Sequence, residues 1–169
     1  RNKMAITITK ENYPALANGT GISGKRVVLY LNYGATATAE APKWELVGGL
    51  KSHTLSISAE VNTQQTKESG YWAKGAMISK SAELSCEVVM ERDDTAQAAI
   101  EAFMLDDEIT AAKNALMFAI VDLDTKEYVQ LWAIPTSWEI SADGEDMVMK
   151  SLSATVVGNP EKKTEFTAS

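Results

Sequence analysis

Two stretches of the sequence alternate regularly between apolar and polar residues. In residues 50–61 the apolar residues Leu55, Ile57, Ala59 and Val61 fall at every second position, and in residues 77–90 the same holds for Ala82, Leu84, Cys86 and Val88. Successive side chains of a β-strand point to opposite faces, so this period of two is typical of an amphipathic strand. The pattern predicts two long strands that can pair as a hairpin.

A second pair of strand-like stretches follows at residues 127–140 and 147–157, joined by the turn residues 142–145. Residues 115–123 and 26–33 are also rich in the β-branched and aromatic residues that favour strands, and residues 44–47 are a short extended candidate. Pro135 interrupts the first strand of this second hairpin. Because proline cannot donate to a sheet ladder, we expect Pro135 at an edge or a bulge.

One segment has helical spacing. Asp93 and Asp94 can cap a helix, since a side-chain oxygen there accepts hydrogen bonds from otherwise unpaired amides. After them an apolar stripe recurs at intervals of three and four residues, formed by Ala96, Ala99, Ile100, Phe103 and Met104. These elements predict a mainly β fold, a β-sandwich or barrel with two long hairpins and one flanking α-helix at about residues 94–105.

The 169 residues are enough for one domain with a real core. We assign residues 26–158 to that domain, residues 1–25 to a flexible N-terminal segment and residues 159–169 to a polar C-terminal tail.

The loop between the first two strands, residues 62–76, is unusual. It is about three times the length of an ordinary hairpin loop, and long loops are often functional. It is polar apart from Tyr71 and Trp72. Large aromatic residues are enriched at interfaces, but they also cover cores, so both readings of Trp72 stay open.

Charge and composition exclude several classes of function. Hydrophobic residues make up 45% and charged residues 23% of the chain, and the formal net charge is −7. An acidic surface disfavours tight binding of nucleic acid, which needs clustered Lys and Arg. The longest apolar runs are far shorter than the roughly 20 residues of a membrane-spanning helix, so no membrane association is expected.

The residues that could carry catalysis are sparse. His53 is the single histidine and lies in an alternating strand without a nucleophile elbow, and Cys86 is the single cysteine and lies on an apolar face. A lone cysteine excludes an internal disulfide and a tetrathiolate metal site. We therefore expect a non-enzymatic protein with no cofactor and no metal.

The order of motifs along the chain is similar to that of a known family. The motifs are the run Trp44-Glu45-Leu46-Val47-Gly48-Gly49-Leu50-Lys51-Ser52, the alternating serine strand, the long loop with Tyr71-Trp72, Lys80-Ser81, the Asp93-Asp94 helix and the closing Ser/Thr strand. Over residues 27–158 this arrangement resembles the phage major tail proteins, also called tail tube proteins. The resemblance rests on the whole arrangement, since no single motif is specific.

The resemblance implies a structural virion protein. Six subunits would close into a ring, and stacked rings would form the tail tube through which DNA is delivered without specific binding. The partners would be further copies of this chain and other tail proteins: tape measure, terminator, and baseplate or sheath. The protein would be found in the virion tail, and in the host cytoplasm during assembly.

The resemblance also implies roles for particular residues. In the family, two long hairpins from each subunit build the inner wall, here residues 50–90 and 127–157. The loop at 62–76 would reach the neighbouring ring through Lys67, Tyr71, Trp72 and Lys74. If the apolar strand faces form the core, the channel would be lined by Ser56, Ser58, Glu60, Glu83, Ser85, Glu87, Ser151, Ser153 and Thr155. Without the resemblance, these nine residues would be read as an ordinary solvent-exposed sheet face.

A second class of function stays open from the sequence. A carbohydrate- or protein-binding β-sandwich, such as an adhesin or a tail-decoration module, would use a platform of exposed aromatic residues: Trp44, Trp72, Trp132 and Trp138. A hydrolase on a β scaffold is the weakest candidate, because no residue positively favours it.

Overall fold

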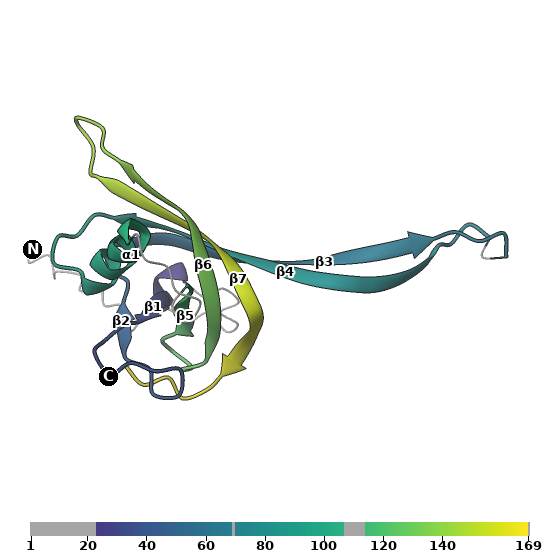
Figure 1. The fold of residues 1–169 in the computed structure, drawn as a ribbon, viewed down its shortest axis with the longest axis horizontal. Helices are drawn as coiled ribbons and strands as arrows, with labels where there is room; N and C mark the ends of the chain where they lie inside the picture. The colour runs from purple at the N-terminus through teal and green to yellow at the C-terminus, as the bar shows by residue number, and fades with distance from the viewer. Residues whose placement is uncertain (1–22, 69, 107–113, 169) are drawn as a thin grey trace, which may run out of the picture.

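The computed structural model of the chain describes residues 23–68, 70–106 and 114–168 (Figure 1). Within these ranges the chain forms seven strands and one α-helix, with a short 3-10 helix, η2, at Gly24–Arg26. The elements are β1 Val27–Asn32, β2 Trp44–Leu46, β3 Leu50–Gln64, β4 Lys74–Val89, α1 Thr95–Leu105, β5 Leu116–Asp122, β6 Tyr128–Ser141 and β7 Met149–Lys163. The mainly β class and the single flanking helix are confirmed.

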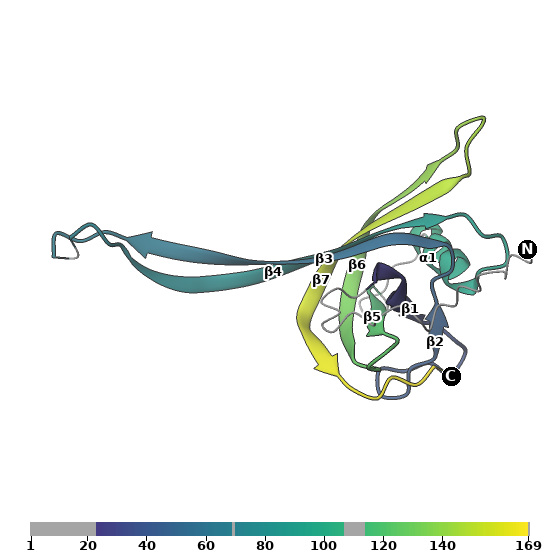
Figure 2. The ribbon, with the colours of Figure 1, turned by 180° about the vertical axis from the view of Figure 1, so that it is seen from behind.

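All seven strands belong to one antiparallel sheet, in the order β2-β1-β5-β6-β7-β4-β3. The sheet curls so that β1 comes close to β3 (Figures 1 and 2). We call the curled part of the subunit, together with α1, the body. The two predicted hairpins are present as β3–β4 and β6–β7. They also pair with each other through β4 and β7.

The β3–β4 hairpin is longer than the alternation predicted. β3 continues to Gln64 and β4 begins at Lys74, so the predicted loop at residues 62–76 is reduced to residues 65–73. Its outer part projects away from the body as a two-stranded arm (Figures 1 and 2). In the described part of the chain the arm comprises residues 57–68 and 70–82, and both of its faces are largely exposed. The outer ends of β3 and β4 are mostly polar, so the sequence pattern did not identify them as strand.

The main core lies inside the curve of the sheet. It joins the inner faces of β1, β4, β5, β6 and β7 to α1, and its fully buried side chains include Leu29, Leu84, Ile100, Phe118 and Leu152. Burial of side chains of this size contributes about 1.5–3 kcal/mol each. Outside the arm, the apolar faces of both long hairpins thus pack mainly against the core of the same subunit.

A second cluster covers the other face of β1 and β5, and it corrects the prediction of a polar tail at 159–169. β7 continues to Lys163 opposite Tyr128, and Phe166 is buried against Tyr30, Trp44 and Tyr128. The Phe166 amide donates to the Lys126 carbonyl at 2.9 Å. Backbone pairing as far as Lys163 and the apolar anchor Phe166 together keep this polar segment in the fold. Of the predicted N-terminal segment 1–25, residues 1–22 lie outside the described part of the chain.

Local chemistry explains α1 and the bulge in β6. The Asp94 carboxylate caps α1 by accepting from the Gln97 amide at 3.0 Å. The β6–β7 pairing is irregular between Pro135 and Ser137, and β5 no longer pairs with β6 there, which agrees with the expectation of an edge or a bulge at Pro135. No helix within the described ranges is long and apolar enough to cross a membrane.

Candidate assembly surfaces

The nine residues predicted to line a channel all lie on one face of the sheet. Residues directly opposite each other in neighbouring strands share a face. Glu83 lies between Ser56 and Thr155, and Ser85 lies opposite Ser153. Glu87 lies opposite Ser151, and Ser58 and Glu60 continue the same face along the arm. The alternation in single strands was therefore sufficient to identify a face that extends across three strands.

The residues that the fourth strand, β6, contributes to this face were not identified from the sequence. Ser137 lies opposite Ser153, and Glu139 lies opposite Ser151. The bulge after Pro135 shifts the alternation of β6, so its polar positions could not be aligned with those of β7. We call the whole surface the polar face: it consists of the nine predicted residues together with Ser52, Thr54, Ser79, Ser81, Thr136, Ser137 and Glu139.

The polar face carries negative charge. Its ionisable side chains are the carboxylates of Glu60, Glu83, Glu87 and Glu139, and none of its residues is Lys or Arg. Lys51, at the irregular start of β3, places its Nζ 3.8 Å from Glu87 Oε1. The Ser79 hydroxyl donates to Glu60 at 3.1 Å. The face therefore offers hydroxyl groups and carboxylates to whatever lies in front of it.

The four strands behind the polar face have two open margins. β3 pairs only with β4, and it is the last strand of the sheet. On the other side, β5 pairs with β6 only as far as Ala133, so residues 134–141 of β6 pair with β7 alone. Unpaired strand margins present free backbone donors and acceptors and are templates for pairing with another chain.

The tip of the arm gathers the four residues predicted to reach a neighbouring ring. Lys67, Tyr71 and Trp72 lie in the connecting residues 65–73, and Lys74 begins β4. Tyr71 is fully exposed and Trp72 is 85% exposed. Behind them the arm exposes further large apolar side chains: Ile57, Val61, Met77 and Ile78. Trp72 therefore does not pack over the described sheet of its own subunit.

A second tip lies at the other end of the same strands. The β6–β7 turn carries Asp143, Glu145 and Asp146, and Met147 beside them is 73% exposed. The Asp143 carboxylate accepts from the Gly144 amide at 2.8 Å and so shapes the turn. Val89 lies opposite Met149 and Glu83 lies opposite Thr155, so the arm leaves one end of the paired region and this acidic turn leaves the other.

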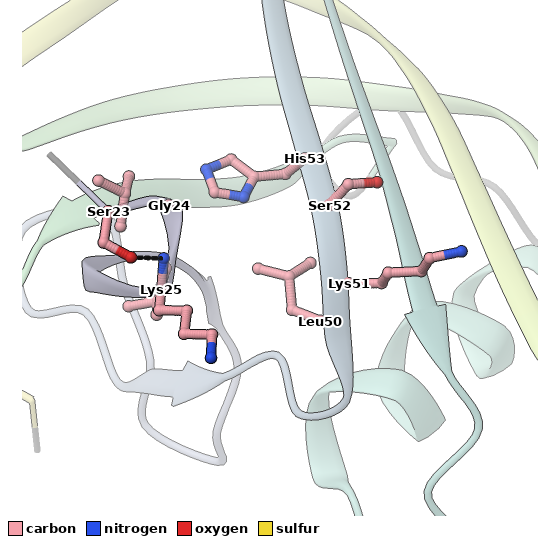
Figure 3. Close-up of a pocket in the computed structure, with 9 residues that line it drawn as sticks. Ser23, Gly24, Lys25, Leu50, Lys51, Ser52 and His53 are labelled. Atoms are coloured by element: carbon pink, nitrogen blue, oxygen red, sulfur yellow. Dashed lines mark hydrogen bonds between the residues drawn. The ribbon is translucent and has the colours of Figure 1, made fainter. Parts of the chain in front are cut away.

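A cavity of about 490 Å³ separates η2 and the start of β1 from the start of β3 (Figure 3). His53 points toward η2 in this view, whereas Lys51 extends in the opposite direction, toward β4. Burial lowers the pKa of His53 below its usual value, so the imidazole is neutral at pH 7. Within the described ranges, no group of three or more His, Cys, Asp and Glu side chains could hold a metal ion.

The four tryptophans do not form the binding platform of the alternative hypothesis. Trp44 is buried in the cluster around Phe166, Trp138 packs against the main core, and Trp72 lies at the arm tip. Only Trp72 and Trp132 are exposed, and they lie in different places: Trp72 is in the connection between β3 and β4 at the arm tip, and Trp132 is on β6. This arrangement removes the structural basis for the platform.

Comparison with known proteins agrees with this geometry. A family model described as "Phage tail tube protein" matches residues 21–162. The tail of an empty GTA particle with C6 symmetry contains a chain that is 20% identical, with a TM-score of 0.67 over 85% of this chain and 100% of that chain. The SPP1 tail tube chain is 18% identical, with a TM-score of 0.69 over 88% of this chain and 82% of that one.

More distant structures share the fold. The sheath–tube complex of an extracellular contractile injection system includes a chain that is 10% identical, with a TM-score of 0.59 over 94% of this chain and 100% of that chain. No curated protein sequence matches the chain. Because the family model spans most of the sequence and the described fold is that of tail tube chains, the protein belongs to the phage tail tube protein family and is a structural component of the tail.

Proposed function

We propose that six copies of this chain close into a ring by edge-to-edge pairing of their hairpins, and that stacked rings form a channel for DNA lined by the polar face. The observation that carries the proposal is the four-stranded sheet β6-β7-β4-β3, which has one acidic, polar face and two open margins. Outside the arm, the opposite, apolar face of this sheet already packs against the core of the subunit.

The two open margins differ, so pairing them makes a head-to-tail contact. The β3 margin of one copy would pair with residues 134–141 of β6 in the next copy. Head-to-tail contacts generate a closed ring when the rotation between copies closes. The C6 symmetry of the GTA tail supports six as the number of copies. Closure would also protect the two open margins of the four-stranded sheet, which a free subunit leaves exposed.

The chemistry of the polar face suits a channel through which DNA slides. Neutralisation of phosphates by Lys and Arg releases counterions, and this release holds DNA on a protein surface. Hydroxyl groups and carboxylates do not neutralise phosphates, so they release no counterions and do not hold DNA in this way. Four carboxylates on each copy would instead repel the phosphates and keep the passing DNA away from the wall.

The remaining partners follow from the same role. The chain would contact further copies of itself, and at the ends of the tube other tail proteins such as the tape measure, terminator, and baseplate or sheath. Similar chains in a baseplate structure and in a sheath–tube complex support contacts of these kinds. No catalytic step is needed for this role. The protein would assemble in the host cytoplasm and remain in the virion tail.

Hydrogen exchange during assembly tests the edge-to-edge pairing. Purified protein is followed by electron microscopy at rising concentration, and peptides are compared between the monomeric and assembled forms. We expect amides in β3 and in residues 134–141 to become protected in the rings, because they gain backbone partners. β1 and β5, paired within the subunit, serve as the internal reference. Rings that form while both margins exchange as fast as in the monomer would exclude this pairing.

A further inference from the structure

We propose that the arm tip of one copy docks on the acidic β6–β7 turn of a copy in the adjacent ring. The inference rests on the proposed function, because it assigns the contact that joins one ring to the next. The arm tip comprises residues 65–68 and 70–74, and the acidic turn comprises residues 142–147. The partner is a second copy of this chain.

The placement of the two tips supports end-to-end contact. They leave opposite ends of the β4–β7 pairing, so copies stacked in the same orientation bring the arm tip of one toward the acidic turn of the next. β4 extends over nine residues, 74–82, beyond the last β7 partner of the pairing. At about 3.3 Å per residue, the arm reaches roughly 30 Å past that point. It is long enough to cross a gap between stacked bodies.

The charges of the two tips are opposite. The arm tip carries Lys67, Glu68 and Lys74, which sum to +1 in a chain whose net charge is −7. The acidic turn carries Asp143, Glu145 and Asp146, which sum to −3. All six side chains are exposed. Electrostatic complementarity of this kind guides docking and fixes its register.

The apolar parts of the tips also match. Tyr71 and Trp72 are exposed on the arm tip, and Met147 is exposed beside the carboxylates of the acidic turn. A thioether makes favourable contacts with aromatic rings, and an aromatic side chain buries a large area at low cost in conformational entropy. Exposed ion pairs alone contribute little. The aromatic–methionine contact would therefore provide most of the affinity, and the charges would select the site.

Charge reversal on each side and then on both sides tests the contact. The variants are K67E/K74E on the arm tip, E145K/D146K on the acidic turn, and their combination. Asp143 is kept because its carboxylate shapes the turn. We expect each single-sided variant to raise the critical concentration for tube formation by about tenfold or more, because a ring loses all its copies of the contact together. The combined variant should restore tubes.

Matched controls have the same change in charge elsewhere. K25E/K43E matches the arm-tip variant, and E40K/E45K matches the acidic-turn variant; all four side chains are exposed and lie outside both tips. Both controls should form tubes. Tubes of normal length in both single-sided variants would overturn the inference, and so would a combined variant that does not recover. Wild-type protein that forms neither rings nor tubes would instead overturn the proposed function.

Discussion

Cys86 shows how completely the inner face of β4 is removed from water. It is 5% exposed, between Leu84 and Val88 in the core, and burial raises the pKa of its thiol to about 11. Because the thiolate is the reactive form, native protein should react very slowly with an alkylating reagent at pH 8 and quickly in concentrated urea. Fast alkylation of the folded protein would show that this part of the sheet opens readily.

The same pKa predicts a pH dependence of stability. Above about pH 9 the thiol ionises in the unfolded chain but not in the folded one, so the unfolded state binds fewer protons and stability falls with rising pH. The loss should run between pH 9 and about 11. The measurement is the free energy of unfolding for wild type and for C86A across this window. The C86A variant, although less stable overall, should show a shallower decline.

Lys150 is a buried charge that joins β7 to the helix α1. It lies on the apolar face of β7 with a 7% exposed side chain. Its Nζ is 2.7 Å from Glu101 Oε2 on α1 and 5.7 Å from the centre of the Trp138 ring. In the sequence, Lys150 interrupts the apolar residues that occupy alternate positions from Val148 to Val156. A strand pattern alone cannot reveal that a carboxylate from a helix lies above such a position.

Replacement of one partner of this pair should cost more than replacement of the other. E101Q leaves the ammonium of Lys150 buried without a full counter-charge, so we expect a loss of about 3 kcal/mol in the free energy of unfolding. K150M removes the buried charge and fills a similar volume, so its cost should be clearly smaller. Urea unfolding of the two variants measures the difference. Equal losses would mean that water already solvates the ammonium.

At the scale of elements, we expect the arm to be needed for assembly but to contribute little to the free energy of unfolding of the subunit. Tyr71 and Trp72 touch little of their own subunit, so Y71A/W72A should change the free energy of unfolding by no more than ~0.5 kcal/mol. The same variant should still form rings but few tubes in electron microscopy, because the apolar part of the docking contact is lost. L84A, which removes a fully buried side chain of β4, is the contrasting control and should cost about 2–5 kcal/mol. A large loss of stability in Y71A/W72A would place the aromatic pair in the fold instead.

The elements themselves could be predicted to a large extent from the sequence. Both long hairpins, the bulge at Pro135 and the helix capped by Asp94 follow from local periodicity and local hydrogen bonding. The ends of β3, β4 and β7 did not follow, because Gln64, Lys74 and Lys163 lie in strands that are held by backbone pairing and not by an apolar face. Backbone pairing leaves no pattern in the side chains.

The polar face was predictable for a related reason, and only in part. Alternation within a strand identifies which residues share a face, and this was enough for the nine residues on β3, β4 and β7. Strand order and register depend on contacts between distant segments. The contribution of Ser137 and Glu139, and the open margin of β6 beside them, therefore became visible only in the folded sheet.

At the scale of the whole molecule, the acidity of the polar face should control the passage of DNA. E60K/E87K introduces two cations on this face, which would hold phosphates by counterion release. We expect normal tubes but slower DNA ejection, with the defect reduced at higher ionic strength. E40K/E45K carries the same change in charge outside the polar face and should eject at the wild-type rate. Equal ejection rates in both variants would show that these strands do not line the channel.

The two projecting tips also give the subunit a direction. One end of each copy presents a reaching arm and the other presents a short acidic turn, so a stack of equally oriented rings has unlike termini. Growth at the two termini would then add different surfaces and need not be equally fast. A protein that starts such a filament would have to imitate one tip, and a protein that stops it would have to imitate the other.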